Sequence, residues 1–240
     1  MSVTIRYLYH SGFAIETKHH FFIFDYWKIK PDDGGMEQGV ISMEEVREKD
    51  VVFLVSHKHA DHYNPQIIHL KKLIPNCRII LSDDIPTVDG AMMVGPGKTI
   101  QERDFSLRTL DSTDAGVAFL LEVDGLQIFH AGDLNWWHWE EESEANNLKM
   151  AQDYQSQIQL LGQTEIDLAF IPVDPRLGKH CFLGIDYLMR NVNVRHVIPM
   201  HFADNISVGE KLLKEPLTKP YREKIILLLE RGASVDLFCI

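Results

Sequence analysis

Short hydrophobic runs, separated by turn residues, recur along the whole chain. They are rich in β-branched and aromatic side chains, which predicts strands. The predicted strands cover residues 3–9, 13–17, 21–27, 51–55, 77–82, 117–123, 126–131, 167–173, 195–200 and 234–238. Asp124-Gly125 lies between two of these runs and has the composition of a two-residue hairpin turn.

Helix signals lie mainly between the later strands. The predicted helices cover residues 42–49, 64–74, 144–161, 186–192 and 219–231. Ser42 and Glu45 have the spacing of a capping box. Asn64 and Asp186 are expected N-caps, and Gly232 is the expected stop after the last helix. Strands that alternate with helices predict an α/β fold of two packed sheets with helices outside.

The composition adds limits to this picture. The length of 240 residues suits one large domain with a buried core, and no linker or internal repeat is visible. We therefore expect a single domain over residues 1–240. The net charge of −11 argues against nucleic acid as the natural partner, because nucleic-acid binders usually carry a basic face.

The cysteines and the apolar runs bear on the compartment. Cys77, Cys181 and Cys239 lie far apart and form no CxxC pattern, so free thiols in a reducing compartment are expected. The N-terminal residues lack a signal-peptide pattern, and the apolar runs are too short to cross a bilayer. We expect a cytoplasmic protein that does not bind a membrane.

The segment Ser56–Pro65 reads SHKHADHYNP and begins where a predicted strand ends. His57, His59 and Asp61 alternate, so on an extended segment they share one face. His62 breaks the alternation, so the chain is expected to bend at Asp61-His62 and present both side chains at a second position. Imidazole nitrogens and carboxylate oxygens suit Zn²⁺, Fe or Mn. The loop therefore predicts one wall of a metal site for one or two divalent ions.

Two further candidate ligands follow predicted strands elsewhere. Asp133 comes after LQIFHAG, and His201 comes after RHVIPM. Ligands in loops at strand ends are a common way for a scaffold to display chemistry. We expect both side chains to join the metal site, because the loop alone supplies too few ligands to complete it.

These pieces resemble the metallo-β-lactamase superfamily in type and order. The opening 8–13, the strand end Phe24-Asp25 and the segment 129–133 are similar to its L-ascorbate-phosphate-lactonase-like branch. The resemblance implies an αββα four-layer sandwich of two mixed β-sheets with outer helices.

The resemblance also implies how the ligands are shared. His57 and His59 belong to a first metal position, Asp61, His62 and His201 belong to a second, and Asp133 bridges the two. A hydroxide held by the metal ions then attacks an ester, lactone, amide or phosphodiester. Asp61 and Asp133 are the expected catalytic carboxylates, and Asp61 is also a candidate acceptor for the proton of that water.

The chain departs from the family pattern at one ligand. The family has a further histidine where residues 110–117 lie here, and that segment contains none. Asp114 or Asp111 can replace it, which favours Mn²⁺ or Fe over Zn²⁺. Alternatively, His138 or His180 supplies the ligand, or the first position is weak or empty. We favour Asp114, for which an ordinary turn residue is the competing interpretation.

Four residues are candidates for substrate contact or for support of the ligands. His10 lies in a tight turn of the segment that resembles the lactonase-like branch. His138 follows two tryptophans shortly after Asp133, where it is a candidate proton donor. Asp174 and Arg176 follow a predicted strand and are candidates for binding an anionic group, with a local ion pair as the alternative.

The sequence thus predicts a metal-dependent hydrolase that acts on a small ester, lactone or phosphoester. One alternative is a phosphodiesterase or nuclease of the same fold, for which the basic groove is missing. The other is a degenerate member that binds metal without catalysis. We expect a small-molecule substrate and no nucleic acid, and a homo-oligomer stays open.

Overall fold

The computed structural model of the protein describes residues 2–31 and 34–238. Contacts divide the chain into two compact units. Unit 1 comprises residues 1–95 and 228–240, and unit 2 comprises residues 96–227. Each unit contains one complete sheet, so the two are described in turn.

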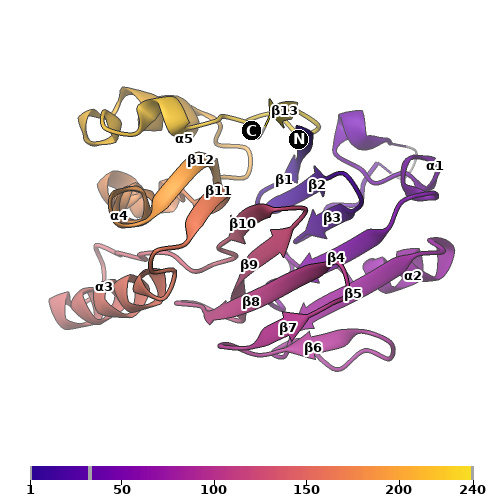
Figure 1. Ribbon diagram of the computed structural model, residues 1–240. Coiled ribbons are helices and arrows are strands. Elements are labelled where there is room, and N and C mark those ends of the chain that lie inside the picture. Colours follow the sequence, from indigo (N-terminus) through magenta and orange to yellow (C-terminus); the bar gives the residue numbers. More distant parts are fainter. Residues whose placement is uncertain (1, 32–33, 239–240) are drawn as a thin grey trace. The chain divides into compact units, whose positions relative to one another are not determined.

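Unit 1 is built on a seven-stranded mixed sheet in the order β13-β1-β2-β3-β4-β5-β6 (Figure 1). The strands from β13 to β3 pair antiparallel, and those from β3 to β6 pair parallel. Their bounds are β1 Ser2–Tyr9, β2 Gly12–Glu16, β3 Phe21–Phe24, β4 Val51–Val55, β5 Cys77–Ser82, β6 Met92–Val94 and β13 Ser234–Phe238.

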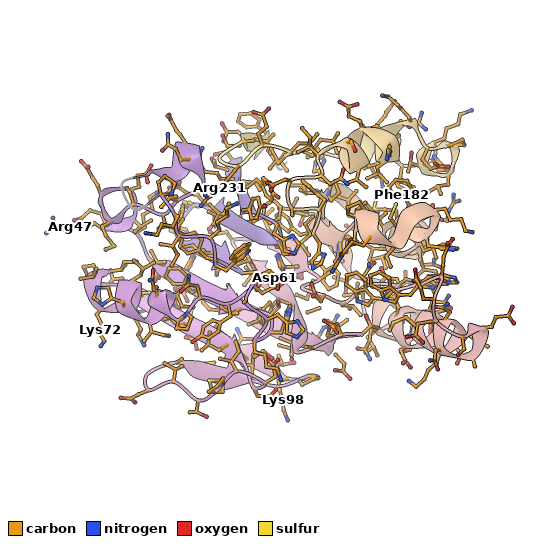
Figure 2. The ribbon with its side chains drawn as sticks, turned by 180° about the vertical axis from the view of Figure 1, so that it is seen from behind. Arg47, Asp61, Lys72, Lys98, Phe182 and Arg231 are labelled. Carbon is orange, nitrogen blue, oxygen red and sulfur yellow. The ribbon has the colours of Figure 1, made fainter. Side chains whose placement is uncertain are left out.

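The central strands of unit 1 are buried on both faces. All residues of β3 and β4 are buried, as expected for parallel strands that carry continuous hydrophobic runs. The 3₁₀ helix η1 (Met36–Gln38) and the helices α1 (Met43–Val46) and α2 (Gln66–Leu73) add Met36, Val46 and Ile67 to the same hydrophobic cluster. The returning C-terminal segment is fixed by Arg231, whose guanidinium donates to the carbonyls of Leu8 and Gly39 (Figure 2).

Unit 2 is built on a six-stranded mixed sheet in the order β12-β11-β10-β9-β8-β7. The strands β10, β11 and β12 are parallel, and those from β10 to β7 pair antiparallel. The bounds are β7 Thr99–Gln101, β8 Phe105–Asp111, β9 Val117–Val123, β10 Leu126–His130, β11 Glu165–Pro172 and β12 Asn193–Met200. Asp124 and Gly125 join β9 to β10 with left-handed φ values of 51° and 77°, as the predicted hairpin turn requires.

The helices of unit 2 follow its sheet. They are α3 Glu144–Gln159, α4 Leu183–Asn191 and α5 Ser207–Lys214, with 3₁₀ helices η2 Pro175–His180, η3 Pro216–Thr218 and η4 Arg222–Lys224. Ser143 caps α3 by accepting a hydrogen bond from the amide of Asn146. The buried Tyr154 hydroxyl joins α3 to α4 by donating to the carbonyl of Gly184 at 2.7 Å.

The ten predicted strands are all present, and three further strands were not predicted. These are β6, β7 and β8, and β8 shows why. Its sequence FSLRTLD places Ser106 and Arg108 between buried hydrophobic residues, so only one face is continuously apolar. A strand of this kind has alternation in place of a continuous hydrophobic run, so the pattern of hydrophobic runs does not predict it.

The predicted helix over residues 219–231 is wrong. Its hydrophobic residues continue in extended form, because Ile225 forms an isolated bridge with Val197 and the amide of Ile226 donates to the carbonyl of Val197. The helix α5, which buries Val208 and Leu212, was not predicted. Tertiary pairing with β12 thus overrides the local hydrophobic pattern.

Two of the other helix expectations need correction. Ser42 and Glu45 form the predicted capping box at α1. The N-cap of α2 is Pro65 and not Asn64, although the side-chain oxygen of Asn64 accepts from the amide of Gln66. Asp186 is not an N-cap, because α4 begins three residues earlier and Asp186 pairs with Arg190 within the helix.

The expected α/β fold with two mixed β-sheets and helices is confirmed. The single domain over residues 1–240 stays a prediction. Among the described residues Cys77 and Cys181 are free thiols, and Cys239 lies outside them. Within residues 2–31 and 34–238, no helix combines the length and the apolar character that crossing a membrane requires.

Candidate metal centre

The histidine-rich loop of unit 1 leaves the end of β4 and turns back within a few residues. The amides of His62 and Tyr63 both donate to the carbonyl of His59, so the turn begins at His59 and not at Asp61 as the alternation suggested. This turn brings the ring of His62 to 4.0 Å from that of His57, centroid to centroid. The rings of His57 and His59 lie 4.7 Å apart and nearly perpendicular. His57 and His62 are buried, and His59 is exposed.

A buried carboxylate, Asp25, holds this loop in place. The strands β3 and β4 are parallel neighbours, so Asp25 after β3 and Ser56 after β4 lie at the same edge. The amide and the hydroxyl of Ser56 each donate to Asp25 at 2.7 Å. Nδ1 of His62 lies 2.8 Å from Asp25, and Nδ1 of His57 lies 2.9 Å from the Ser56 hydroxyl. Because a carboxylate only accepts, it fixes the His62 proton on Nδ1 and leaves the lone pair on Nε2.

His10 and Asp61 complete the cluster in unit 1. Nε2 of His10 lies 3.4 Å from Asp61, and ligand atoms of His10, Asp61 and His62 lie within 4.8 Å of one another. The hydrogen bond from His10 holds the pKa of Asp61 well below its usual range, although burial opposes this. His10 has a left-handed φ of 60°, and its amide donates to the hydroxyl of Tyr7. The turn that places this imidazole is thus a strained one fixed by its surroundings.

Unit 2 contains a second cluster, at the carboxyl ends of its parallel strands. Asp133 follows β10, Asp174 follows β11 and His201 follows β12. His201 lies between the two carboxylates, with Nδ1 3.0 Å from Asp174 and Nε2 3.2 Å from Asp133. All three are buried, and His201 has a left-handed φ of 66°. The chain turns sharply at His201.

Asp174 is the support of this second cluster. It also accepts from the guanidinium and the amide of Arg176. Burial by itself raises the pKa of Asp174, but the hydrogen bonds from His201 and Arg176 outweigh it and lower the pKa to about 2. Asp174 and Arg176 thus form the local ion pair that was the alternative to binding an anionic group, and the pair orients His201.

Asp114 lies beside Asp133. Their ligand atoms lie within 4.8 Å of each other. Thr113 explains this position, because its hydroxyl donates to the carbonyl of Asn135 at 2.6 Å and accepts from the amide of Asn135 at 2.9 Å. The segment 110–117, which lacks the expected histidine, is therefore hydrogen-bonded to the backbone that follows Asp133.

The other replacements proposed for the missing histidine lie elsewhere in unit 2. The amide of Asp111 donates to the side chain of Gln157 on α3, and Asp111 is exposed. The rings of His138 and His180 lie against each other, with centroids 3.9 Å apart and planes tilted by 31°. Among these candidates, the structure places Asp114 next to a predicted ligand.

The tryptophans after Asp133 divide their roles. Trp137 is buried, its indole N–H donates to the carbonyl of Asp133 at 3.0 Å, and its ring meets that of His201 edge-on at 5.5 Å. Trp139 stacks on Trp137 at 6.3 Å. Trp137 therefore packs directly behind two predicted ligands.

Three supporting residues carried no assigned role in the sequence-based prediction: Asp25, Ser56 and Thr113. A signal existed for Asp25, because it ends a buried hydrophobic run just as Asp174 does. Ser56 immediately precedes His57, but its bond to Asp25 depends on the pairing of β3 with β4. Thr113 had no signal beyond its place next to Asp114.

Comparison with known proteins decides the family. The sequence profile of the beta-lactamase superfamily domain matches residues 4–201. The chain belongs to the metallo-β-lactamase superfamily. Metal-dependent hydrolases of Korarchaeum cryptofilum and Deinococcus radiodurans are each 25% identical to this chain, over 98% and 83% of its length and 100% and 84% of their own. The expected enzyme class of the superfamily, a metal-dependent hydrolase, is thereby confirmed at this coarse level.

Three solved structures share the fold. Igni18, a metallo hydrolase from Ignicoccus hospitalis, is similar with a TM-score of 0.67 and 15% identity over the full length of both chains. YhfI from Bacillus subtilis, a metallo-β-lactamase fold protein, has a TM-score of 0.66 and 11% identity over 98% of this chain and 99% of its own. CmlA, a diiron β-hydroxylase from Streptomyces venezuelae, has a TM-score of 0.64 and 11% identity over 98% of this chain and 54% of its own. The superfamily fold therefore carries more than one chemistry, and the lactonase-like branch stays a prediction.

Proposed function

We propose that this superfamily member hydrolyses a small ester, lactone or phosphoester with one or two divalent metal ions. The proposed ligands are His57, His59, Asp61, His62, Asp133 and His201, with Asp114 in place of the missing histidine. The observation that carries the proposal is the pair of carboxylate–histidine contacts, Asp25 to His62 and Asp174 to His201.

The donor set fits a metal ion. Histidines that ligate metals usually donate their other ring N–H to a carboxylate or a carbonyl, which fixes the tautomer and the ring orientation. His62 and His201 have this arrangement through Nδ1, and His57 has a related one through the hydroxyl of Ser56. A bound divalent ion would lower the pKa of a water molecule and offset the negative charge that develops during hydrolysis.

The carboxylates of the chain have separate tasks in this proposal. The lowered pKa of Asp61 keeps it anionic and makes it a weak base, which favours its role as a ligand over that of proton acceptor. With Asp114 beside Asp133, the first metal position would have more oxygen ligands, and such a donor set favours Mn²⁺ or Fe over Zn²⁺.

Substrate and location are proposed on the sequence alone. Lactones and phosphate-bearing esters lead through the resemblance to the lactonase-like branch, and the acidic net charge of −11 argues against a nucleic-acid substrate. A cytoplasmic protein with a small-molecule substrate completes the proposal. The experiments must distinguish this proposal from two alternatives, a phosphodiesterase and a metal-binding protein without catalysis.

The main test combines metal analysis with a substrate panel. The purified chain is loaded with Mn²⁺ or Zn²⁺ and assayed on generic lactones, esters and phosphodiesters. His201→Ala should lower the metal content and reduce the rate roughly 100-fold or more. The variant loses a metal ligand, and with the metal ion it loses the charge that offsets the negative charge of the transition state. His196→Ala, on the same strand, is the matched control and should change neither. Full metal content in His201→Ala would remove this residue from the ligands, and bound metal without any turnover would favour the non-catalytic alternative.

A second test addresses the replacement ligand. Asp114→Ala should lower the number of metal ions held per chain, or lower the affinity for one of them about tenfold. Asp111→Ala is the matched control, because Asp111 is the neighbouring carboxylate that faces α3. Equal metal content in the two variants would contradict the assignment of Asp114.

A further inference from the structure

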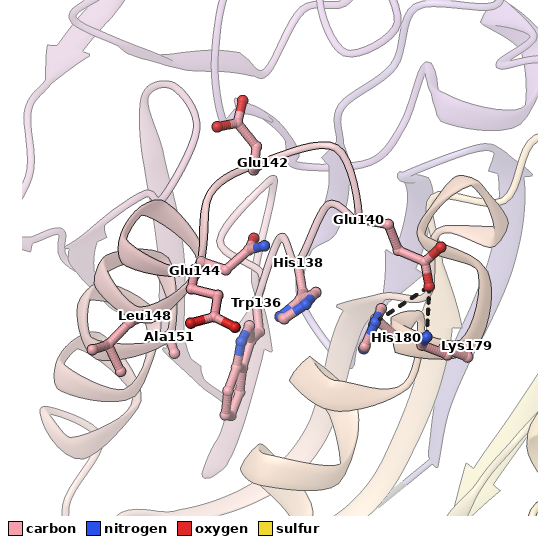
Figure 3. A pocket seen from close by; sticks show the side chains of 10 residues that line it. Trp136, His138, Glu140, Glu142, Glu144, Leu148, Ala151, Lys179 and His180 are labelled. Carbon is pink, nitrogen blue, oxygen red and sulfur yellow. Dashed lines mark ion pairs between the residues drawn. The ribbon is translucent and has the colours of Figure 1, made fainter.

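Unit 2 has a pocket of about 730 Å³ that the proposed hydrolase does not use (Figure 3). Its walls come from the loop after Asp133, the start of α3 and the end of η2. Among the described residues that line it, neither Asp133 nor His201 is found. The pocket is therefore distinct from the predicted ligands of this unit.

Two imidazoles and a carboxylate gather on one side of this pocket. The rings of His138 and His180 lie 3.9 Å apart, centroid to centroid, at an angle of 31°. Nε2 of His180 lies 3.7 Å from Oε1 of Glu140. Figure 3 shows His138 and Glu140 on either side of His180, with the ion pairs of Glu140 drawn as dashed lines.

The backbone that carries these side chains is well fixed. Asn147 on α3 accepts from the amide of Trp139 at 3.1 Å and donates to its carbonyl at 2.7 Å. These two bonds hold the chain between His138 and Glu140. His180 is the last residue of η2, which follows the strand β11 and the buried Asp174. The two imidazoles thus approach each other from two anchored segments and not from mobile tails.

The chemistry of this group suits a d-block divalent cation. Imidazole nitrogens prefer Zn²⁺, Ni²⁺ and Cu²⁺ over Mg²⁺ and Ca²⁺, and the carboxylate of Glu140 adds an anionic oxygen. Burial and the neighbouring His138 lower the pKa of His180, so its ring is neutral near neutral pH, as a ligand must be. Glu142 and Glu144 also line the pocket and make its rim attractive to cations.

One cation already competes for the carboxylate. Nζ of Lys179 lies 2.8 Å from Glu140, but the side chains are 74% and 60% exposed. Ion pairs with this exposure contribute little to stability, so a metal ion can displace Lys179 at small cost. The partly buried rings of His138 and His180 line the pocket, and the three side chains must turn before one ligand atom of each lies within 4.8 Å of the others.

We propose that His138, His180 and Glu140 form a second, separate binding site for a d-block divalent cation such as Zn²⁺. The site does not depend on the proposed hydrolytic centre, since it shares no side chain with it.

The test counts zinc on the full chain. The protein is saturated with Zn²⁺, separated from unbound metal by gel filtration and analysed for zinc per chain. The double variant His138→Gln/His180→Gln should hold one zinc ion fewer than the wild type, and each single variant should bind that ion at least tenfold more weakly by calorimetric titration. His196→Gln is the matched control and should hold as much zinc as the wild type. Equal zinc in the wild type and a folded double variant would overturn the proposal.

Two further variants separate this site from the proposed hydrolytic centre. Lys179→Met should tighten the additional zinc ion by a few-fold, because Glu140 then has no competing cation. His201→Ala should keep this ion, whatever happens to the metal of the other centre. In the wild type, the ring proton signals of His138 and His180, assigned by the single variants, should shift with the last equivalent of zinc. Unshifted signals, or loss of the ion in His201→Ala, would contradict a separate site even if the glutamine variants were poorly folded.

Discussion

Each unit orients a predicted metal-binding histidine with a buried carboxylate, but the hydrogen-bond partners of the two carboxylates differ in exposure. In unit 1 the carboxylate after β3, Asp25, holds His62 in the loop after β4. In unit 2 the carboxylate after β11, Asp174, holds His201 directly after β12. In both, the carboxylate and the histidine follow neighbouring parallel strands, which end at the same edge of a sheet. The parallel pair thus explains how a carboxylate distant in sequence reaches its histidine.

The surroundings of the two carboxylates differ. Asp25 is completely buried and bonded to Ser56 and His62, which are also buried. Asp174 shares its oxygens between buried His201 and Arg176, and the Arg176 side chain is 64% exposed. The partners of Asp25 named here are all buried, whereas Asp174 has an exposed partner in Arg176. A buried hydrogen-bond network without such a partner is the more sensitive of the two.

The largest effect is expected for Asp25→Asn. The amide nitrogen would face either the Ser56 amide or the donor of His62, and neither can turn to solvent. His62 would then move its proton to Nε2, the nitrogen that must carry the lone pair for a metal. Metal affinity should fall about 100-fold, and titration of the variant with Mn²⁺ and Zn²⁺ measures it. An affinity within threefold of the wild type would show that Asp25 does not orient His62.

Asp174→Asn should have a smaller effect. Arg176 can move into solvent, so the amide oxygen is available to His201 and the ring keeps its orientation. Metal affinity should fall about tenfold or less, again by titration. The ratio between the two variants is the decisive quantity. If Asp174→Asn were as damaging as Asp25→Asn, the exposed partner would not provide the freedom assigned to it.

A still smaller effect is expected for Ser56→Ala. The hydroxyl donates to Asp25 and contacts Nδ1 of His57, so its removal leaves a buried acceptor with one partner fewer. The free energy of unfolding should fall by about 1–2 kcal/mol in urea denaturation. Ser82→Ala is the matched control. Ser82 is a buried serine at the end of β5, as Ser56 is at the end of β4, but the hydroxyl of Ser82 has no hydrogen-bond partner among the described residues. A loss of stability in Ser82→Ala as large as in Ser56→Ala would show that burial, and not the bond to Asp25, is measured.

The smallest effect concerns acid and the metal-free protein. The folded state lowers the pKa of Asp174 from 3.8 to about 2, so the ionised form stabilises the fold. This contribution is complete above about pH 4 and is lost as the pH falls toward 2. Denaturation in the presence of a chelator should therefore show a weaker loss of stability between pH 4 and 2 for Asp174→Asn than for the wild type. Identical slopes would mean that Asp174 does not titrate with folding.

Much of the fold could be predicted from the sequence. Continuous runs such as VVFLV predict buried parallel strands, because both faces of such a strand must be apolar. The one-sided strand β8 and the helix α5 contain no continuous hydrophobic run, so the hydrophobic pattern does not predict them. The run in residues 225–230 was taken for a helix, although its first residues pair with β12. Its periodicity does not show whether another strand will offer hydrogen bonds, so only the tertiary pairing decides.

The residue types of a candidate metal site could be read from the sequence alone. Three histidines and an aspartate in one loop, with Asp133 and His201 at strand ends, suffice to predict a metal-dependent hydrolase. The sequence also showed that a histidine is missing near residue 114. The candidate ligands depend on residue type and on position relative to strands, which are local properties, whereas the hydrolase activity and the missing histidine follow from the resemblance to the superfamily.

Only the tertiary structure decided which groups orient the ligands. Asp25 lies 37 residues from His62, and Asp174 lies 27 residues from His201. Their contacts exist because parallel strands bring their ends together, and strand order is not written in any local pattern. The same is true of Asp114, which Thr113 fixes to the backbone after Asp133, and of His138 and His180, which meet across a pocket.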